Sequence, residues 1–536
     1  MAIDVIKIFP PIGIARLGNS LEDELQHQSS PNPGEFFVGP EIPGDQTPPP
    51  GGYKDARLRI KRQAARFYLF GYEAGSADDD SGKEITLTDA DIKWTVDLAN
   101  TKADWHKFGG IEHTNLPLRN ETISGANRAS LRITPGFRTL DSTEPVDKLF
   151  KHPTKHFNTG TFLSVNVPLG EMQTDEAGHL LVLGGFGNSD SPHNRALSNF
   201  ANNDDWYDDV SDGPVNASVR FKGTDKWIEA SSAWVICAPP KFAPQIEDII
   251  TLYDSLLQAA VDKGLRGASE LVPTGRPSFT KDVYPLLARA MGMKWVSALA
   301  QVMHPKVRNS MPSPGSDTPD QKNARIDVFR RLRNPNDDPR NTVFKQDMPK
   351  IWSDLYPLHV GASLTKIQYR LLEQWKEGDF DNDWMSSTLT DVVSTDRITP
   401  KGLTRAALEN CVGGNFYPGI ETSFMTRDSY TFVEPFEFRL DATQLKPGDL
   451  TKQMAIPWQA DFWDCAYDDL EGQVEGLQWW PAHRPDDVFP VGTTSQVRWI
   501  READNINTRE DFVQSWYKFG FVIRQGDQYV ESQRST

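Results

Sequence analysis

Short apolar runs bounded by turn residues dominate the first 240 positions of the chain. Gly, Asn and Asp separate these runs at irregular intervals, which is typical of antiparallel sheets rather than of repeated βαβ units. Charged and apolar residues alternate over 59–73, so this run predicts a strand with one solvated face. Residues 29–52 are too rich in Pro and Gly for regular structure. Further strands are predicted within 84–100, 160–172, 179–187, 216–223 and 230–240.

Apolar positions fall at helical spacing once the chain has passed Pro240. Glycines close several of these runs, as Gly378 does, and glycine is the usual residue at the end of a helix. The charged stretch 308–349 predicts a loop. Helices are predicted within 246–265, 280–303, 363–380 and 403–414.

Strand patterns return towards the C-terminus, within 430–441, 495–500, 515–525 and 528–532. We therefore expect an α+β fold with three regions. Residues 1–240 form a β-rich region, 241–415 a mainly helical region, and 416–536 a second β-rich region.

Composition narrows the function classes. The chain has 536 residues and a net charge of −17, which disfavours broad binding to nucleic acid or to anionic membranes. Mean hydropathy is −0.52, and no run approaches the roughly 20 apolar residues of a membrane-spanning helix. Asp4, Lys7 and two prolines interrupt the first twenty residues, so they do not resemble a secretory signal. We expect a cytoplasmic protein, or one exported without a conventional signal peptide.

Three cysteines, Cys237, Cys411 and Cys465, are too few for a disulfide framework. The ten histidines show no metal-ligand spacing, so we assign no metal. Gly184–Gly187 lacks the spacing of a nucleotide-binding loop and predicts a glycine turn. The five aspartates within 204–212 do not have EF-hand spacing, and a solvated turn is favoured over a calcium loop.

The densest candidate chemistry lies in 457–489. Asp461 precedes Cys465 by four residues, and Trp479 and Trp480 follow before the turn PAHRPD. From these residues alone, a buried structural cysteine and packed tryptophans are the commoner outcome. A reactive thiol would need a nearby base, which Asp461 could supply.

This segment resembles the cofactor-forming stretch of the LodA-like family, the lysine ε-oxidases and glycine oxidases that carry cysteine tryptophylquinone. The resemblance extends over most of the chain in ordered blocks. These include IARLGNS (14–20), YKDARLRIKRQAARF (53–67), WTVDLAN (94–100), LLVLGGFG (180–187), DWYDDVSDGPV (205–215), AWVICAPP (233–240) and CVGGNFYPGIET (411–422).

The resemblance implies a redox cofactor made from the protein's own side chains. A tryptophan becomes an ortho-quinone and is cross-linked to the sulfur of Cys465. Trp480 is the tryptophan we assign, with Trp479 in reserve, because neighbours on an extended segment face opposite sides. Asp461 matches the family aspartate that serves cofactor formation and proton transfer.

The implied reaction is oxidative deamination of a primary amine or amino acid with O₂, which releases an aldehyde or keto acid, ammonia and hydrogen peroxide. Tyr207 falls where the family has an aromatic residue near the quinone, within the part of the pocket that 1–240 contributes. Cys411 resembles the lysine-oxidising branch, so the lysine ε-amine is favoured over glycine. Each has a plainer alternative, a turn cap for Tyr207 and helix packing for Cys411.

The implied partners are the amine substrate, O₂ and a separate flavoprotein that oxygenates the tryptophan, and we expect a homo-oligomer. Two alternatives stay open. One is an oxidase for glycine or another amino acid. The other is a catalytically silent relative, in which Cys465 and the tryptophans stay unmodified and the β-rich scaffold binds a partner.

Overall fold

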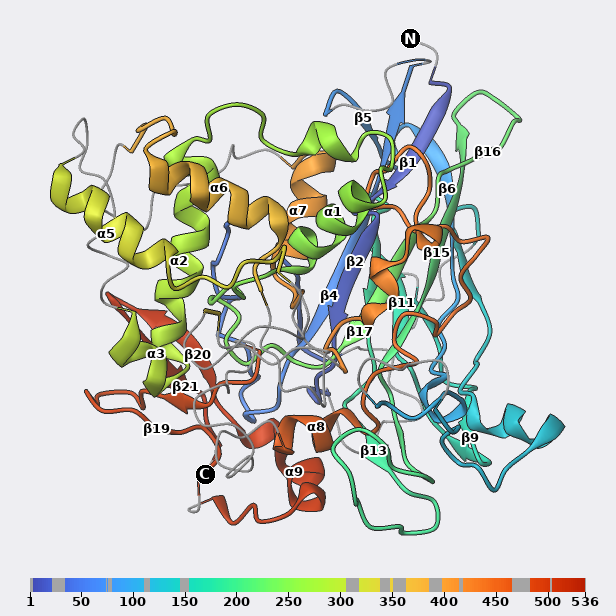
Figure 1. The fold of residues 1–536 in the computed structure, drawn as a ribbon. Coiled ribbons are helices and arrows are strands. Elements are labelled where there is room, and N and C mark those ends of the chain that lie inside the picture. Colours follow the sequence, from blue (N-terminus) through green and yellow to red (C-terminus); the bar gives the residue numbers. More distant parts are fainter. Residues whose placement is uncertain are drawn as a thin grey trace.

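A 13-stranded sheet assembled from the N-terminal region forms the framework of the molecule (Figure 1). The computed structural model describes residues 3–21, 34–73, 75, 80–109, 116–144, 154–304, 318–337, 348–349, 363–384, 398–413, 418–464, 483–501 and 504–535. The path through the sheet is β7-β6-β15-β17-β2-β4-β12-β11-β8, with β1, β3 and β5 paired to β4 and β16 paired to β15. Its strands are β1 (Val5–Phe9), β2 (Ile12–Arg16), β3 (Phe36–Val38), β4 (Arg62–Tyr72), β5 (Lys83–Ile85), β6 (Ala90–Val96), β7 (Arg138–Asp141), β8 (Thr154–His156), β11 (Glu171–Thr174), β12 (Leu180–Leu183), β15 (Ser211–Phe221), β16 (Ile228–Glu229) and β17 (Ala233–Ala238).

Most neighbouring strands run antiparallel, as the irregular spacing of the apolar runs predicts. The pairs β2–β17 and β3–β4 are parallel. Two short hairpins stand beside the main sheet, β9 (Thr161–Phe162) with β10 (Val165–Asn166), and β13 (Ser189–Asp190) with β14 (Tyr207–Asp208).

The long strand β4 is buried on both faces, so the prediction of one solvated face is wrong. Ala65, Phe67 and Leu69 point into the main core of the sheet. Tyr68 and Phe70 pack in a second cluster with Leu403 of α7 (Pro400–Glu409). Alternation along a strand gives two faces, but it does not say what covers each of them.

The middle of the chain is helical, with α1 (Leu252–Asp262), α2 (Tyr284–Gly292), α3 (Ala298–Met303), α5 (Pro319–Phe329), α6 (Lys366–Glu377) and α7. Helix α6 ends at Gly378, whose φ of 86° is in the left-handed region that glycine favours. Helix α5 lies inside the stretch predicted as loop, which corrects that prediction. Thr318 and Gln321 form a capping box at its start, and its buried residues Arg325 and Phe329 fix it on the core.

The C-terminal region contains α8 (Trp458–Asp464), α9 (Arg509–Ser515) and the hairpin of β20 (Phe521–Gln525) and β21 (Gln528–Ser532). A shorter pair joins β18 (Asp487–Val488) and β19 (Val497–Arg498). The strand predicted in 430–441 forms only an isolated bridge between Phe432 and Leu440. Phe438, with φ of 62°, turns the backbone away from extended geometry there.

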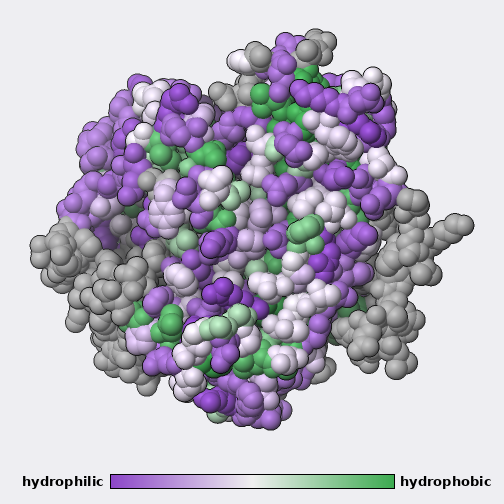
Figure 2. Space-filling model, turned by 90° about the vertical axis from the view of Figure 1, so that its right-hand side faces the viewer, coloured by the Kyte–Doolittle hydropathy of each residue, from purple (hydrophilic) through white to green (hydrophobic). Residues whose placement is uncertain are grey.

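Helices α8 and α9 lie against each other at the end of the sheet near β13 (Figure 1). The face seen in Figure 2 is mostly hydrophilic, with apolar residues in small separate groups. In the described parts of the chain, no helix combines the length and apolar character needed to cross a bilayer. The boundaries at 240 and 415 stay a prediction.

Candidate active site

Asp461 lies on α8 and is buried, with 3% of its surface exposed. Trp458 and Phe462 on the same helix meet edge to face, with 5.0 Å between ring centroids. Trp458 meets Trp516 in the same way at 5.4 Å. The helix that carries the candidate base is therefore packed through aromatic rings.

The backbone that leads into α8 is held by polar side chains from the N-terminal region. Each of three consecutive carbonyls accepts a hydrogen bond of 2.9 Å: Met454 from Arg119 Nη2, Ala455 from Lys102 Nζ and Ile456 from Asn203 Nδ2. In the first turn, Gln459 donates to the carbonyl of Gly187 at 3.0 Å and accepts from Ser189 Oγ at 2.7 Å. Side chains and backbone of the N-terminal region therefore hold the start of α8 through several hydrogen bonds.

Asp208 is the centre of this arrangement. Its Oδ2 accepts from Lys102 Nζ at 2.7 Å and from the backbone N–H of Trp458 at 3.0 Å. Asn100 Nδ2 donates to Asp208 Oδ1 at 2.9 Å and to its carbonyl at 2.8 Å. Both charged groups are fully buried, and burial lowers the pKa of Lys102 while Asp208 opposes that change. We call Asn100, Lys102, Arg119 and Asp208 the Asp208 cluster.

A second group of buried charges surrounds His483, which follows Trp480 by three residues. Glu421 Oε1 lies 2.5 Å from His483 Nε2 and 2.8 Å from Arg16 Nη2. Asp248 Oδ2 lies 3.1 Å from His483 Nδ1 and 3.9 Å from Lys241 Nζ. We call these five buried residues, Arg16, Lys241, Asp248, Glu421 and His483, the His483 cluster.

The carboxyl groups of the His483 cluster are held in their charged form. Burial alone would raise the pKa of Glu421, but His483 and Arg16 outweigh it and lower the value to about 2. The pKa of Asp248 is also lowered, because His483 and Lys241 together outweigh its burial. The cluster therefore buries opposite charges together, which compensates part of their desolvation.

The chain after the candidate tryptophans is bonded back to α8. Arg484 Nε donates to the carbonyl of Phe462 at 2.8 Å. The backbone N–H of Phe242 donates to the carbonyl of His483 at 2.9 Å. The two described ends that flank 465–482 therefore meet at α8.

Cys411 is buried beside the His483 cluster. Its Sγ donates to the carbonyl of Ala407 at 3.2 Å and lies 3.9 Å from Arg16 Nη2. Burial raises the pKa of this thiol well above its usual value, so the neutral form is favoured. Arg16 thus lies between the thiol and His483, since its Nη2 is also 3.2 Å from His483 Nε2.

Tyr207 lies on β14 and packs with its ring 5.5 Å from that of Phe162. It belongs to the same apolar cluster as Ala460 of α8, whereas Cys411 belongs to a different one. Burial, with Asp190 and Asp209 nearby, raises the pKa of the phenol to about 12, so it stays a hydrogen-bond donor. Tyr207 is next in the chain to Asp208, which binds the first turn of α8, and Cys411 lies beside Arg16 of the His483 cluster.

The aspartate run 204–212 is not a solvated turn, and that prediction is wrong. Four of its five aspartates, Asp205, Asp208, Asp209 and Asp212, are buried. Their carboxylates bind side chains and backbone N–H groups of other segments, which is why a local turn was the wrong model. Within the described residues, no group of His, Cys, Asp and Glu side chains is arranged to hold a metal ion.

The glycine run 184–187 wraps around Asp209. The backbone N–H groups of Phe186 and Asn188 donate to Asp209 Oδ2 at 2.7 and 3.0 Å. A Cβ on Gly185 would lie 2.5 Å from that same oxygen, so only glycine fits there. Burial raises the pKa of Asp209 to about 7 despite these hydrogen bonds.

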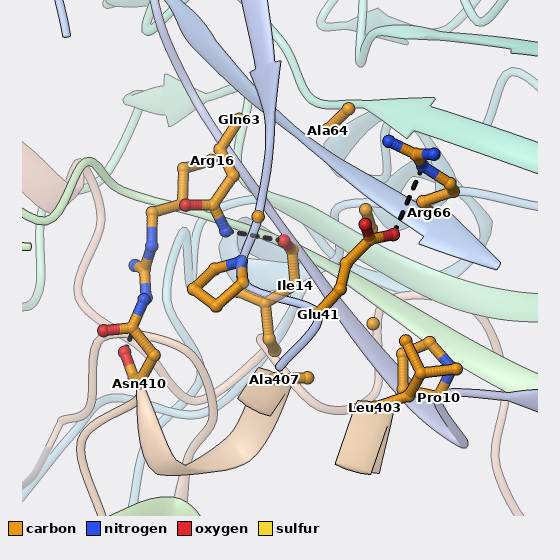
Figure 3. Close-up of a pocket in the computed structure, with 14 residues that line it drawn as sticks. Pro10, Ile14, Arg16, Glu41, Gln63, Ala64, Arg66, Leu403, Ala407 and Asn410 are labelled. Carbon is orange, nitrogen blue, oxygen red and sulfur yellow. Dashed lines mark hydrogen bonds and ion pairs between the residues drawn. The ribbon is translucent and has the colours of Figure 1, made fainter. Parts of the chain in front are cut away.

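Figure 3 shows a pocket between β2, β4 and α7. The ion pair of Arg66 with Glu41, at 3.2 Å, lies on one side of it, and Arg16 with Asn410 on the other. Its cavity of about 20 Å³ holds about one water molecule, too little for an amino acid.

Cys465, Trp479 and Trp480 lie outside the described residues, so their assignment stays a prediction. Sequence reasoning missed Lys102, Asp208, Glu421 and His483 as site residues. Asp208, Glu421 and His483 stand in segments that carry the family resemblance, and Lys102 follows the block 94–100 by two residues.

Two family models match the chain. The L-lysine epsilon oxidase N-terminal model covers residues 9–237, and the L-lysine epsilon oxidase C-terminal domain model covers 345–481. Together they span more than half of the sequence, and the chain belongs to this LodA family of oxidoreductases.

The relatives agree with this membership. The L-lysine 6-oxidase of Marinomonas mediterranea is 28% identical, over 86% of this chain and 71% of that protein. A crystal structure of the L-Lys epsilon-oxidase from the same organism matches with a TM-score of 0.76 and 22% identity, over 99% of this chain and 95% of that one. A structure of the Schiff base intermediate of that enzyme with L-Lys matches with the same coverage and a TM-score of 0.75. At this identity the structural likeness establishes the fold, which confirms the predicted α+β class.

Proposed function

We propose that this protein is a cysteine tryptophylquinone-dependent oxidase that deaminates a primary amine or amino acid, with the ε-amine of lysine as the favoured substrate. The observation that carries the proposal is the buried Asp461 on α8, in a chain that belongs to the lysine ε-oxidase family. The name of the relative, L-lysine 6-oxidase, supports the choice of substrate.

The residues fit the cofactor at both flanks of 465–482. Cys465 follows the last residue of α8, and Trp480 precedes His483 by three residues. Because Arg484 is bonded to Phe462, both flanks belong to one rigid neighbourhood. This supports a thioether between Cys465 and Trp480, with Trp479 in reserve.

The cofactor would supply an electrophilic carbonyl and an electron sink. Asp461 is the base that takes the proton from the carbon bearing the substrate nitrogen. Tyr207 offers an aromatic wall and a phenol that donates a hydrogen bond to the substrate. Overall, amine, O₂ and water become aldehyde or keto acid, ammonia and hydrogen peroxide, so that O₂ takes up the two electrons.

A separate flavoprotein carries out the tryptophan oxygenation, and the mature enzyme is a homo-oligomer. The test is co-expression with that flavoprotein, followed by intact mass and visible absorbance. The mature chain should gain two oxygens, lose the hydrogens of oxidation and cross-linking, and absorb visible light. An unmodified mass would favour the catalytically silent alternative.

Replacing Asp461 with Asn should abolish quinone formation, since the amide cannot accept a proton at this position. Visible absorbance per chain measures the effect, and retention of the native melting temperature is the control. Normal quinone content would reassign Asp461 to packing.

A further inference from the structure

We propose that Asp208, supported by Asn100 and Lys102, is a positioning residue that sets the orientation of α8 and so of Asp461. The inference deepens the proposed function and rests on the role of Asp461 stated there. It identifies the part of the N-terminal region on which the reaction depends.

Helix α8 has seven residues, too few to be stable without tertiary contacts. Its orientation is therefore decided by the groups that bind its first turn and the residues before it. Asp461 comes three residues after Trp458, so it lies one turn further along the same face of the helix. A shift of the Trp458 amide moves the carboxyl of Asp461 with it.

Only a carboxylate at position 208 accepts from all three of its side-chain partners at once. The side chain of Asp208 receives hydrogen bonds from Lys102 Nζ, the Trp458 N–H and Asn100 Nδ2, which are all donors. A carboxylate accepts at both oxygens, whereas an asparagine would turn a donor towards one of these donors. No rotation of an amide can satisfy all three partners.

Lys102 couples two points of the same backbone. The single ammonium group binds Asp208 and the carbonyl of Ala455, three residues before the amide that Asp208 itself binds. Residues 455–458 are thus closed into one ring by a buried ion pair. Such a pair contributes modestly to stability, because desolvation offsets much of the attraction, and its geometry is its main effect.

The test compares Asp208→Asn with Glu171→Gln after co-expression with the flavoprotein. Glu171 of β11 is a matched control, since it is also a buried carboxylate and is paired with Arg62 at 2.6 Å. Within the described residues, none of its hydrogen bonds or ion pairs goes to α8. Quinone per chain is read from absorbance, and turnover is counted per quinone by titration with a carbonyl reagent. Amide hydrogen exchange of residues 454–464 reports on α8 directly.

In Asp208→Asn we expect quinone content and kcat per quinone each to fall tenfold or more, with KM within threefold. Exchange protection of α8 should fall at least tenfold. In Glu171→Gln, quinone content, kcat per quinone and exchange protection should each stay within twofold of the wild-type value. If Asp208→Asn does not fold, Asn100→Ala removes only the supporting amide and should lower kcat per quinone about threefold.

The inference is overturned if the foldable variant matches Glu171→Gln in quinone content, turnover and exchange. Wild-type protein without quinone would instead contradict the proposed function. In that case the exchange experiment still decides whether Asp208 holds α8.

Discussion

The Asp208 cluster binds the chain before 465–482, and the His483 cluster contains the first described residue after it. The two clusters differ in what their charged side chains bind. In the Asp208 cluster, the charged side chains bind mainly backbone groups at 454–458. In the His483 cluster, charged side chains bind one another. The first arrangement fixes the path of the backbone, and the second fixes a balance of charges.

This difference predicts different consequences of damage. Losing Asp208 leaves the buried charge of Lys102 without compensation and also frees the Trp458 amide, so it affects both stability and the position of α8. Losing a charge in the His483 cluster leaves a buried opposite charge without compensation, which affects stability more than chemistry. The predictions below separate these two effects.

The largest effect is expected from Cys465→Ser. If the two clusters serve to bring Cys465 and Trp480 together, a hydroxyl in place of the thiol leaves a folded protein without quinone absorbance or peroxide production. Absorbance and a peroxide assay measure both. Full activity in this variant would show that no thioether is needed. The two clusters would then not serve to align Cys465 with Trp480.

Glu421→Gln should destabilise the protein by about 3 kcal/mol, since Arg16 and His483 lose the anion between them. Urea unfolding measures the change. In the fraction that folds, kcat per quinone should stay within about twofold. A normal unfolding midpoint with slow turnover would contradict the view that the His483 cluster affects stability more than chemistry.

The pH dependence of stability, compared between the wild type and Glu421→Gln, tests the same ion pairs. The pKa of Glu421 is lowered to about 2 in the folded state, so its contribution is present above pH 4.5 and is lost as pH falls towards 2. Wild-type stability should therefore fall more steeply than that of Glu421→Gln in this range. Parallel pH curves for the two proteins would contradict the assignment.

Asp209→Asn should act with the opposite sign. The pKa of Asp209 is raised from 3.8 to about 7, so the folded protein loses stability as pH rises between these values, by about 1.4 kcal/mol per pH unit at most. The variant has no such dependence and should be the more stable protein at pH 8. Unfolding at pH 5 and pH 8 measures the difference, and equal slopes would mean that Asp209 is ionised throughout.

The smallest effects are expected at the pocket. Tyr207→Phe removes one hydrogen bond, worth roughly 0.5–1.5 kcal/mol, and should weaken kcat/KM about two- to tenfold without changing the quinone spectrum. Cys411→Ala should be milder. Peroxide release with lysine, ornithine, arginine, glycine and simple amines ranks the substrates, and glycine turning over best would contradict the interpretation of Cys411.

Local patterns predicted several strands of the main sheet, such as β4, β6, β12 and β17, and several helices, but not the central strand β2. Strand β15 (Ser211–Phe221) lies over the predicted 216–223, and α6 ends at the predicted Gly378. The two-sided burial of β4 could not be predicted, because it depends on α7, more than 300 residues further along. The capping box of helix α5, Thr318 and Gln321, can be recognised in the sequence. The many charged residues around it led to the prediction of a loop.

The site was predictable only in part. The spacing of Asp461 and Cys465 is a local feature, and the burial of Asp461 fits its expected role. The partners of Asp208 come from Asn100, Lys102 and Trp458, up to 250 residues away. A run of aspartates read by itself therefore predicts a solvated turn, although its carboxylates hold distant segments in place.

The bond between Lys102 and Ala455 joins positions 353 residues apart in the chain. At a synthesis rate of about 5–20 residues per second, the ribosome needs roughly 20–70 seconds to make the second partner after the first. During that interval Lys102 has no α8 to bind, and Asp208 joins it only after another 106 residues have been made. Under the proposed function, the order of translation delays alignment of Cys465 and Trp480 until almost the whole chain exists, and a nascent fragment offers the proposed flavoprotein no finished substrate.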